Sequence, residues 1–324
     1  MTDNNNSFDA VLIVAFGGPE KLEDIRPFLM KVTQGRVPPE RLETVARHYE
    51  FFGGKSPVNE VTFRQAEALE TILKDQGMPL AVSVGMRNWH PLLVDTVQQM
   101  SRDGVNRAVG VILSVYQSKS SWDQYQSDVA NAIAEAGVDL SVAYTKPLFD
   151  QPGFIKTIAH RAKECLEEIP QPDREAAHVL FTAHSLPHSD PQVEVYAKQV
   201  DCSATSVAKG LAHENWQVAY QSRSGRPQDP WLEPDIRDVL RELGTRGVNH
   251  VVAVPIGFVC DNIEVLYDLD IEAMDAARQA GITFLRAKTV NDDQGFIDAL
   301  AALVTQVTLT LQKSRMPEIP GVQG

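Results

Sequence analysis

The stretch Val251-Val-Ala-Val-Pro-Ile-Gly-Phe-Val-Cys-Asp-Asn-Ile-Glu264 decides the fold class of this chain. Its first four residues form an unbroken apolar run, which is typical of a parallel strand that is buried on both faces. Pro255 and Gly257 end the run, and a helical pattern begins near Asp261. The stretch therefore predicts a buried strand followed by a helix, and open α/β sheets bind their ligands at the carboxyl ends of such strands.

The predicted helix carries Glu264, Asp268 and Glu272 four residues apart, so the three carboxylates lie along one side. Like charges at this spacing destabilise a helix by about 0.2–0.5 kcal/mol per pair. A cation or a proton would relieve that repulsion. A solvated acidic face is the commoner meaning of such a helix, but its position at the end of a buried strand favours a ligand site.

Apolar, β-branched segments alternate with segments of helical period along the whole chain. The predicted strands are 10–16, 80–84, 108–115, 140–144, 178–183, 216–221, 250–256 and 282–285. The predicted helices are 64–76, 91–102, 123–136, 154–168, 193–211, 233–243, 262–279 and 296–311. Such alternation implies parallel sheets covered by helices on both faces. Because the strands fall into two similar sets, we predict an α/β protein of two Rossmann-like halves, each a four-stranded parallel sheet flanked by helices.

The division between the halves is predicted within a segment at 146–153 that contains Pro and Gly residues, which mark loops and turns. The N-terminal half then spans 8–150 and the C-terminal half 151–315, with tails at 1–7 and 316–324. The N-terminal half also carries an insertion at 19–60. A long insertion after the first strand of an α/β domain usually forms a lip over the ligand cleft.

Composition limits the partners and the compartment. The chain has 324 residues and a net charge of −13, which disfavours a nucleic-acid partner. No apolar run reaches the roughly 18 residues of a membrane span, and the polar N-terminus lacks the order of a signal peptide. Cys165, Cys202 and Cys260 are far apart, which fits a reducing cytoplasm and falls short of the four thiolates of an iron–sulfur cluster.

Several common site motifs are incomplete or missing from the sequence. Gly54-Lys55-Ser56 is similar to the end of a phosphate-binding loop, but Tyr49 stands where that loop needs a glycine. The chain has no G-x-G-x-x-G, H-E-x-x-H or G-x-S-x-G, so nucleotide binding, zinc proteolysis and serine hydrolysis are disfavoured. A lone histidine at a strand end, such as His184, is more often structural. Together with Glu264, however, it forms a borderline ligand set suited to Fe²⁺, Co²⁺, Ni²⁺ or Zn²⁺.

Six blocks of the sequence together resemble the ferrochelatases, the lyases that insert Fe²⁺ into a porphyrin late in haem synthesis. The blocks follow one another in the family's order over nearly the whole chain. They are Phe16-Gly-Gly-Pro19; Tyr49 with Phe52-Gly-Gly-Lys-Ser-Pro57; Arg87-Asn-Trp-His-Pro91; Phe181-Thr-Ala-His-Ser-Leu-Pro187; Gln221-Ser-Arg-Ser-Gly225 with Pro230-Trp-Leu-Glu-Pro234; and Pro255-Ile-Gly-Phe258 with Asp261, Ile263-Glu264 and Leu266-Tyr267. The resemblance implies a porphyrin cleft between the two halves.

The resemblance also implies roles for single residues. His184 and Glu264 are expected to be the catalytic residues and to bind the metal, and Asp268 and Glu272 to continue the metal site as an acidic track. The helix after Glu264 is expected to widen into a π-helix, a feature that often marks functional sites. The residues expected to bind the porphyrin are Phe16, Tyr49, Ser56, Arg87, Tyr125 and Trp231.

The substrates implied by the resemblance are Fe²⁺ and a porphyrin, with no resident cofactor and no iron–sulfur cluster. Further partners are limited to at most peripheral membrane contact and neighbouring haem-pathway enzymes. The blocks are most similar to the actinobacterial-type group, which favours coproporphyrin III over protoporphyrin IX. Two departures matter: Asn262 stands where many relatives have His, and Phe16 where some coproporphyrin-type enzymes have an iron-contacting Tyr.

Three questions stay open at the level of the sequence. His184 is suited to accept a pyrrole proton, to bind the metal, or to do both. A cobalt or nickel chelatase of a sirohydrochlorin-type tetrapyrrole is an alternative function with the same fold. A non-catalytic tetrapyrrole-binding protein is an alternative from another class, although His184 and Glu264 together count against a pure binder.

Overall fold

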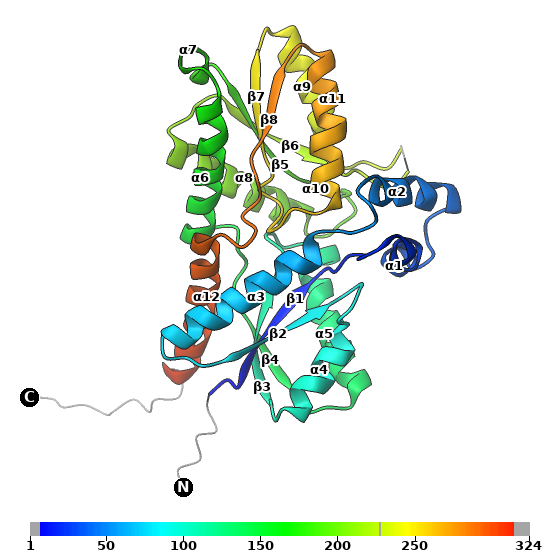
Figure 1. Cartoon of the computed structure of the whole chain (residues 1–324), viewed down its shortest axis with the longest axis vertical. Coiled ribbons are helices and arrows are strands. Elements are labelled where there is room, and N and C mark those ends of the chain that lie inside the picture. Colours follow the sequence, from blue (N-terminus) through cyan, green and yellow to red (C-terminus); the bar gives the residue numbers. More distant parts are fainter. Residues whose placement is uncertain (1–6, 227, 314–324) are drawn as a thin grey trace, which may run out of the picture.

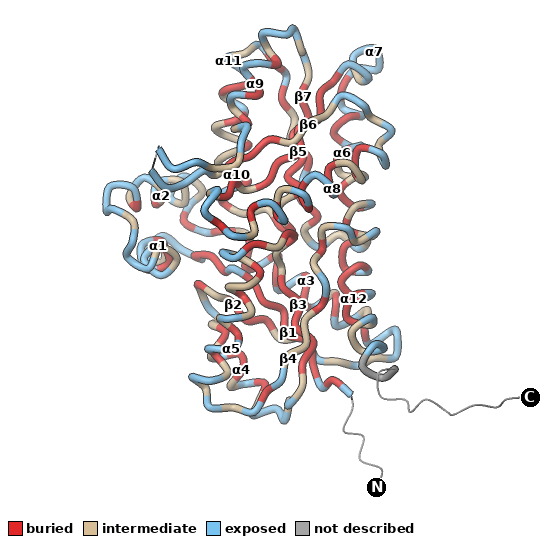
Figure 2. Tube along the Cα trace, turned by 180° about the vertical axis from the view of Figure 1, so that it is seen from behind, coloured by how far each residue is buried: buried red, intermediate tan, exposed pale blue. Residues whose placement is uncertain are grey.

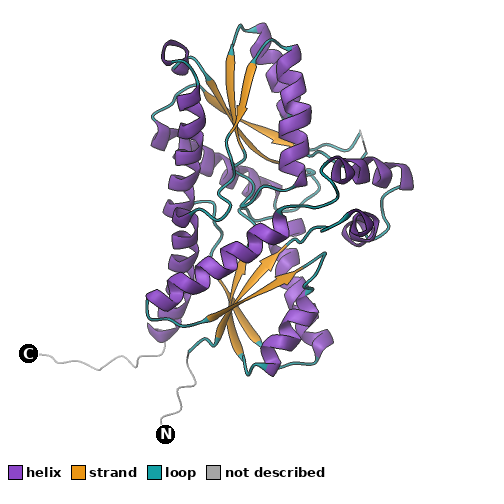
Figure 3. Cartoon of the chain, in the orientation of Figure 1, coloured by secondary structure: helices purple, strands orange, loops and turns teal. Residues whose placement is uncertain are grey.

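The chain folds into two parallel sheets of four strands each, as the computed structural model shows for residues 7–226 and 228–313 (Figure 1, Figure 3). The strand order is β2-β1-β3-β4 in one sheet and β6-β5-β7-β8 in the other, so the two halves share one topology. The strands are β1 (Ala10–Ala15), β2 (Ala81–Met86), β3 (Arg107–Ile112), β4 (Ser141–Tyr144), β5 (His178–His184), β6 (Trp216–Gln221), β7 (His250–Val254) and β8 (Thr283–Arg286). The predicted fold class is confirmed.

Side-chain alternation along the central strands divides the core into layers. In β1, Val11 and Ile13 face one buried cluster, whereas Leu12 and Val14 face another, because successive side chains of a strand point to opposite faces. The first cluster continues into the C-terminal half, where it includes Phe181 of β5. One hydrophobic core thus joins the two halves, and Figure 2 shows the buried residues concentrated along both sheets and at their junction.

Helices cover both faces of each sheet, as the alternating pattern predicted. In the N-terminal half, α4 and α5 lie on one face and α3 on the other; in the C-terminal half, α9 and α11 lie on one face and α6 and α8 on the other. The bounds are α3 (Val58–Asp75), α4 (Leu93–Arg102), α5 (Gln124–Ala136), α6 (Pro152–Glu168), α7 (Gln171–Arg174), α8 (Val193–Leu211), α9 (Ile236–Thr245), α10 (Ile263–Tyr267) and α11 (Met274–Gln279). Two π-helical segments, η2 (Lys119–Asp123) and η3 (Asp268–Ala273), adjoin α5 and α10.

The last helix, α12 (Gln294–Lys313), returns from the C-terminal half and packs against α3 and β3 as well as α6 (Figure 1). The predicted division of the chain at residues 150 and 151 stays a prediction. Of the predicted tails, residues 1–6 and 316–324 lie outside the described residues. Among the described residues, no helix combines the length and the apolar composition that crossing a membrane requires.

The insertion at 19–60 contains two helices that the sequence pattern did not predict. They are α1 (Ile25–Thr33) and α2 (Pro39–Phe51), preceded by a short 3₁₀-helix, η1 (Leu22–Asp24), and they protrude beside the junction of the two halves (Figure 1). Gln34 ends α1 with a φ of 51°. Pro39 opens α2 at a position where the N–H that proline lacks has no partner within the helix. We refer to this insertion as the lip.

Candidate active site

The loop after β7 brings the helix of Glu264 against the end of β5, where His184 lies. β5 and β7 are neighbours in the sheet, and the loop continues alongside β5 because the N–H of Gly257 donates to the carbonyl of Thr182 at 3.1 Å. Only glycine permits this approach, since a Cβ at Gly257 would lie 2.8 Å from the Cα of Ala183. His184 and the loop that leads to Glu264 therefore lie at the same edge of the sheet.

The imidazole of His184 is oriented by the chain around it. Its Nδ1 lies 2.5 Å from the carbonyl oxygen of Ser185, and because a carbonyl only accepts, Nδ1 is the donor. In the neutral ring, Nε2 then keeps its lone pair for a proton or a metal ion. The carbonyl of His184 itself accepts a hydrogen bond of 2.8 Å from the hydroxyl of Tyr196 on α8. These contacts hold the strand end and leave one ring nitrogen available.

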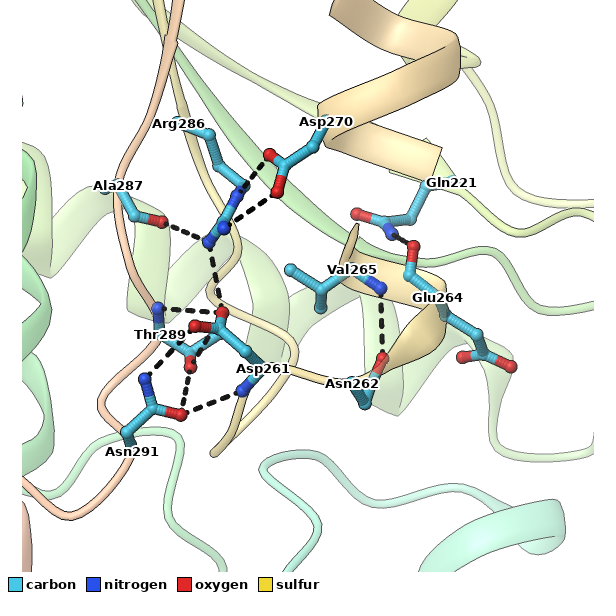
Figure 4. A network of polar contacts seen from close by, with 10 residues as sticks. All are labelled: Gln221, Asp261, Asn262, Glu264, Val265, Asp270, Arg286, Ala287, Thr289 and Asn291. Carbon is cyan, nitrogen blue, oxygen red and sulfur yellow. Dashed lines mark hydrogen bonds and ion pairs between the residues drawn. The ribbon is translucent and has the colours of Figure 1, made fainter. Parts of the chain in front are cut away.

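Glu264 lies in the first turn of α10, with an exposed side chain. The helix is capped by Asn262, whose side-chain oxygen accepts a hydrogen bond of 3.0 Å from the N–H of Val265 (Figure 4). Asn262 is thus the N-cap of α10. Gln221, the register partner of His184, donates to the carbonyl of Glu264 at 3.4 Å. The cap and Gln221 together hold the start of α10 at the sheet edge.

Asp268 and Glu272 follow in the π-helical segment η3, which confirms the widening expected from the resemblance. In a regular α-helix, each step of four residues rotates a side chain by about 40° in one sense. The wider π turn rotates the next step back. Glu264, Asp268 and Glu272 therefore stay closer to one line than in a regular helix. Glu272 also forms an ion pair of 3.2 Å with Arg237 of α9.

Asp268 lies at the electrostatic centre of the predicted metal residues. Burial is the main cause that raises the pKa of Asp268 to about 7. The Ser222 hydroxyl, which donates to the Asp268 carboxylate, lowers that pKa, the charges of Glu264 and Glu272 raise it, and the charge of His184 lowers it. His184, Glu264 and Glu272 thus each lie within electrostatic reach of Asp268. In the part of the chain that the structure describes, no three His, Cys, Asp or Glu side chains form a group that could hold a metal ion.

An aromatic wall faces this acidic helix from the N-terminal half. Phe28 of the lip meets the rings of Phe16, Tyr49 and Trp89 edge-on, with ring centres 6.2, 5.7 and 6.1 Å away. Phe16 is 39% exposed, so part of its ring is free for a ligand. Burial is the main cause that raises the pKa of Tyr49, and the charge of Glu264 adds to it. Tyr49 therefore lies close to the acidic helix.

Arg87 and Tyr125 lie together beside η2, and Tyr125 is buried in the core under α4 and α5, with only 5% of its surface exposed. The Nε of Arg87 lies 2.9 Å from a carboxylate oxygen of Asp128, and its guanidinium carbon lies 5.8 Å from the centre of the Tyr125 ring. Arg87 also donates to the carbonyl of Ser120 in η2 at 3.3 Å. Burial is the main cause that raises the pKa of Tyr125, and Glu264 is among the charges that add to it. The charge of Glu264 on α10 therefore reaches Tyr125 on α5.

The lip contacts the acidic helix through a stacked pair of rings. The imidazole of His48 on α2 and the ring of Tyr267 on α10 are nearly parallel, with centres 3.5 Å apart and 9° between their planes. Phe51 meets Tyr267 edge-on at 6.4 Å. Burial, followed by the charge of Arg47, lowers the pKa of His48. The lip therefore packs one turn away from Glu264.

Ser56 and Trp231 are the two remaining residues that the resemblance predicts to bind the porphyrin. Ser56 is only 2% exposed and lies beneath Gly18, where a Cβ would come within 2.8 Å of the Ser56 Cβ. Trp231 belongs to a loop tied to the His184 turn, because the N–H of Leu232 donates to the carbonyl of Leu186 at 2.8 Å. The roles in porphyrin binding stay predictions for all six residues: Phe16, Tyr49, Ser56, Arg87, Tyr125 and Trp231.

Sequence reasoning missed several residues that contact the site. Tyr196 supports His184, Arg237 pairs with Glu272, and Arg286 binds two acidic residues around the Glu264 turn. None of the three carries a sequence signal, because each sits in a helix or strand whose pattern is already explained by packing. Ser222 and Gln221 lie in one of the blocks that resemble the ferrochelatases, which marked the segment and not their contacts.

Two halves of one topology, each a four-stranded parallel sheet flanked by helices, define the fold class as that of the metal chelatases. The fold is similar to that of the sirohydrochlorin chelatase SirB from Bacillus subtilis subspecies spizizenii in complex with cobalt (TM-score 0.55, 14% identity, 94% of this chain and 97% of that chain). It is also similar to CbiX, the terminal enzyme of sirohaem biosynthesis in denitrifying bacteria (TM-score 0.54, 14% identity, 92% of this chain and 98% of that chain). At such identities the likeness concerns the fold alone.

The ferrochelatase family model matches residues 8–308. Among the relatives, the coproporphyrin III ferrochelatase of Mycobacteroides abscessus is 40% identical over 322 residues, covering 97% of this chain and 94% of the relative. That of Frankia alni is 42% identical over 326 residues, covering 96% of this chain and 81% of the relative. The chain belongs to the ferrochelatase family and is an enzyme that inserts iron into a porphyrin in haem biosynthesis, which confirms the prediction made from the six blocks.

Proposed function

We propose that this ferrochelatase takes coproporphyrin III as its porphyrin substrate. The relatives that match it at 40–42% identity are coproporphyrin III ferrochelatases. Coproporphyrin carries four carboxylates and needs local cations in a protein with a net charge of −13. Arg87 and Lys119 are candidate cations: Arg87 donates to the carbonyl of Ser120, the residue after Lys119. Their present partners are Asp128 and Asp123, which the substrate carboxylates would have to replace or share.

The grouping of His184, Glu264 and Glu272 around Asp268 carries the proposed mechanism. Glu272 and Asp268 pass the hydrated Fe²⁺ substrate to Glu264, which holds it beside the porphyrin after part of its water has left. His184 accepts a pyrrole proton at Nε2, the ring nitrogen that its contact with Ser185 leaves available. In the whole reaction two pyrrole N–H bonds break, two protons leave, and the four porphyrin nitrogens bind the iron.

The aromatic wall is proposed to hold the porphyrin in the bent shape that metal insertion needs. A flat porphyrin hides its nitrogen lone pairs in the ring plane, and bending the ring exposes them. Binding contacts remote from the metal can support a distortion of about 1–5 kcal/mol. Phe16, Tyr49 and Tyr125 are proposed to hold the ring in that shape, with Arg87, Ser56 and Trp231 at its edges.

The test is an anaerobic incubation of the protein with Fe²⁺, Co²⁺ or Ni²⁺ and with coproporphyrin III, protoporphyrin IX or sirohydrochlorin, followed by the loss of the free-base spectrum. We expect the highest kcat/KM for Fe²⁺ and coproporphyrin III. A higher value for Co²⁺ or Ni²⁺ with sirohydrochlorin would favour the alternative chelatase. A shifted spectrum without metal insertion would mean a binding protein.

Single substitutions test the roles of the two central residues. His184→Ala and Glu264→Gln should each lower kcat by about 100-fold or more, with the porphyrin Kd within about threefold of the wild type. His188→Ala is the matched control, because His188 is exposed in the same loop. Near-wild-type rates in either variant would remove that residue from the mechanism.

We further propose that the enzyme works in the cytoplasm without an iron–sulfur cluster. The support is its cysteine content: Cys165 and Cys260 are buried, Cys202 is exposed, and all three are free thiols, a usage typical of a reducing compartment. Neighbouring haem-pathway enzymes and a peripheral membrane contact stay predictions. Metal analysis of the purified protein, together with its visible spectrum before any porphyrin is added, tests the absence of a cluster.

A further inference from the structure

Arg286 ends β8 and binds two acidic residues on either side of the Glu264 turn (Figure 4). Its Nε and Nη2 donate to the carboxylate of Asp270 at 2.6 and 2.9 Å, and its Nη1 donates to Asp261 at 3.0 Å. The Arg286 side chain is only 12% exposed. Because a guanidinium presents its donors in a rigid fork, this contact sets the places of both carboxylates at once.

The two partners of Arg286 bracket the acidic track. Asp261 lies directly before the N-cap of α10, and Asp270 lies in η3 between Asp268 and Glu272. Residues two apart in a helix do not share a face, so Asp270 leaves the helix on the side away from Asp268 and Glu272. Arg286 therefore holds the back of a helix whose front carries the residues proposed to move the metal.

Asp261 is anchored to the rest of the molecule as well. Its carboxylate accepts hydrogen bonds of 3.2 Å from Thr289 Oγ1 and from the side-chain amide of Asn291, and its N–H donates to Asn291 Oδ1 at 2.9 Å (Figure 4). The carbonyl of Asn291 accepts a hydrogen bond of 2.7 Å from the side chain of Gln65 on α3. The network thus ties the start of the metal-site helix to the N-terminal half.

We propose that Arg286 is a positioning residue for metal insertion. This role rests on the proposed function. Arg286 fixes the π-helical turn from the side away from the track, and so sets the relative positions of Glu264, Asp268 and Glu272. An ion pair that served the fold alone would lower stability when broken and leave the metal step of the folded enzyme unchanged. A positioning pair affects the metal step selectively.

The experiment compares Arg286→Met, Arg286→Lys and Asp270→Asn with the wild type, and expresses rates per folded molecule. We expect Arg286→Met to lower kcat/KM for Fe²⁺ by about 10–100-fold, the range for residues that support metal ligands, with KM for the porphyrin within about threefold. Arg286→Lys keeps the charge without the fork and should recover part of the loss. Asp270→Asn should lower kcat/KM for Fe²⁺ by about 3–10-fold, and it tests the proposal even when Arg286→Met does not fold.

Arg161→Met is the matched control. Arg161 also binds two acidic residues, Glu164 on α6 at 3.0 Å and Asp293 just before α12 at 2.9 Å, and neither belongs to the acidic track or contacts Arg286. We expect its kinetics to match the wild type within about twofold. Unchanged kcat/KM for Fe²⁺ in the folded Arg286 and Asp270 variants, or an equal loss in Arg161→Met, would overturn the proposal.

Amide hydrogen exchange over residues 261–273 separates this proposal from the proposed function, because it does not need activity. Exchange there should be at least about tenfold faster in Arg286→Met, and unchanged there in Arg161→Met. If the wild type inserts no metal, the proposed function fails, and this measurement still decides whether Arg286 positions the helix. Equal exchange rates in wild type and Arg286→Met would refute the positioning role even in an active enzyme.

Discussion

Replacing Asp268 with Asn should stabilise the fold while it impairs the enzyme. Burial, with the charges of Glu264 and Glu272, raises the pKa of Asp268 from 3.8 to about 7. Between these values the folded state binds more protons than the unfolded state, so the free energy of unfolding falls as pH rises. A difference of about 3 pH units at about 1.4 kcal/mol each sets a ceiling of about 4 kcal/mol above pH 7.

The expected gain lies below that ceiling. The Asp268 side chain is not fully buried, so solvent screens part of the charge. Asn keeps an oxygen that accepts the hydrogen bond from Ser222. We therefore expect Asp268→Asn to raise the free energy of unfolding by about 2 kcal/mol at pH 8, and by less than half of that at pH 5, where the wild-type carboxyl is protonated in the folded state.

Urea denaturation of the wild type and of Asp268→Asn at pH 8 and pH 5 measures the difference in the free energy of unfolding. In the same variant, kcat/KM for Fe²⁺ at pH 8 should fall. Asp275→Asn is the control, because the Asp275 side chain is 48% exposed beside Arg278, and its effect on stability should stay within about 0.5 kcal/mol. An Asp268→Asn protein that is no more stable than the wild type at pH 8 would mean that the buried Asp268 carboxylate does not destabilise the fold.

Two further predictions concern positions outside the metal track. Burial lowers the pKa of His178 from 6.5 to about 4, so the unfolded state binds more protons in that window and the free energy of unfolding falls as pH drops from 6.5 toward 4. We expect a loss of about 1–2 kcal/mol after solvent screening, seen in urea denaturation at pH 7 and pH 5 and missing from His178→Phe. Gly257→Ala should lower the free energy of unfolding by about 1–3 kcal/mol and should lower kcat. The added Cβ would lie 2.8 Å from the Cα of Ala183 and would displace the strand end that carries His184. Wild-type kcat and stability in that variant would contradict the steric argument.

Much of the scaffold was predictable because buried strands and amphipathic helices leave periodic signals in a sequence. The eight predicted strands all occur, and the helix at 193–211 was predicted with the bounds that the structure shows. The placement of His184 and Glu264 at one sheet edge was predictable as well. Pro and Gly residues mark the ends of their two strands in the sequence, and β5 and β7 are parallel neighbours. The placement of Asp268 and Glu272 on the same side of the helix as Glu264 was predictable from their spacing of four residues.

Other features depended on contacts between segments that are distant in the sequence. The lip helices were missed, since their short apolar faces bury only a small core of their own. The sequence around Arg286 does not predict its ion pairs with Asp261 and Asp270, because the three residues come from a strand, a loop and a π-helix. Periodicity reports which face of an element is buried. It does not report which charged groups from other elements will form ion pairs with one another. Those ion pairs form only when the packed elements bring the charged side chains together in a poorly solvated space.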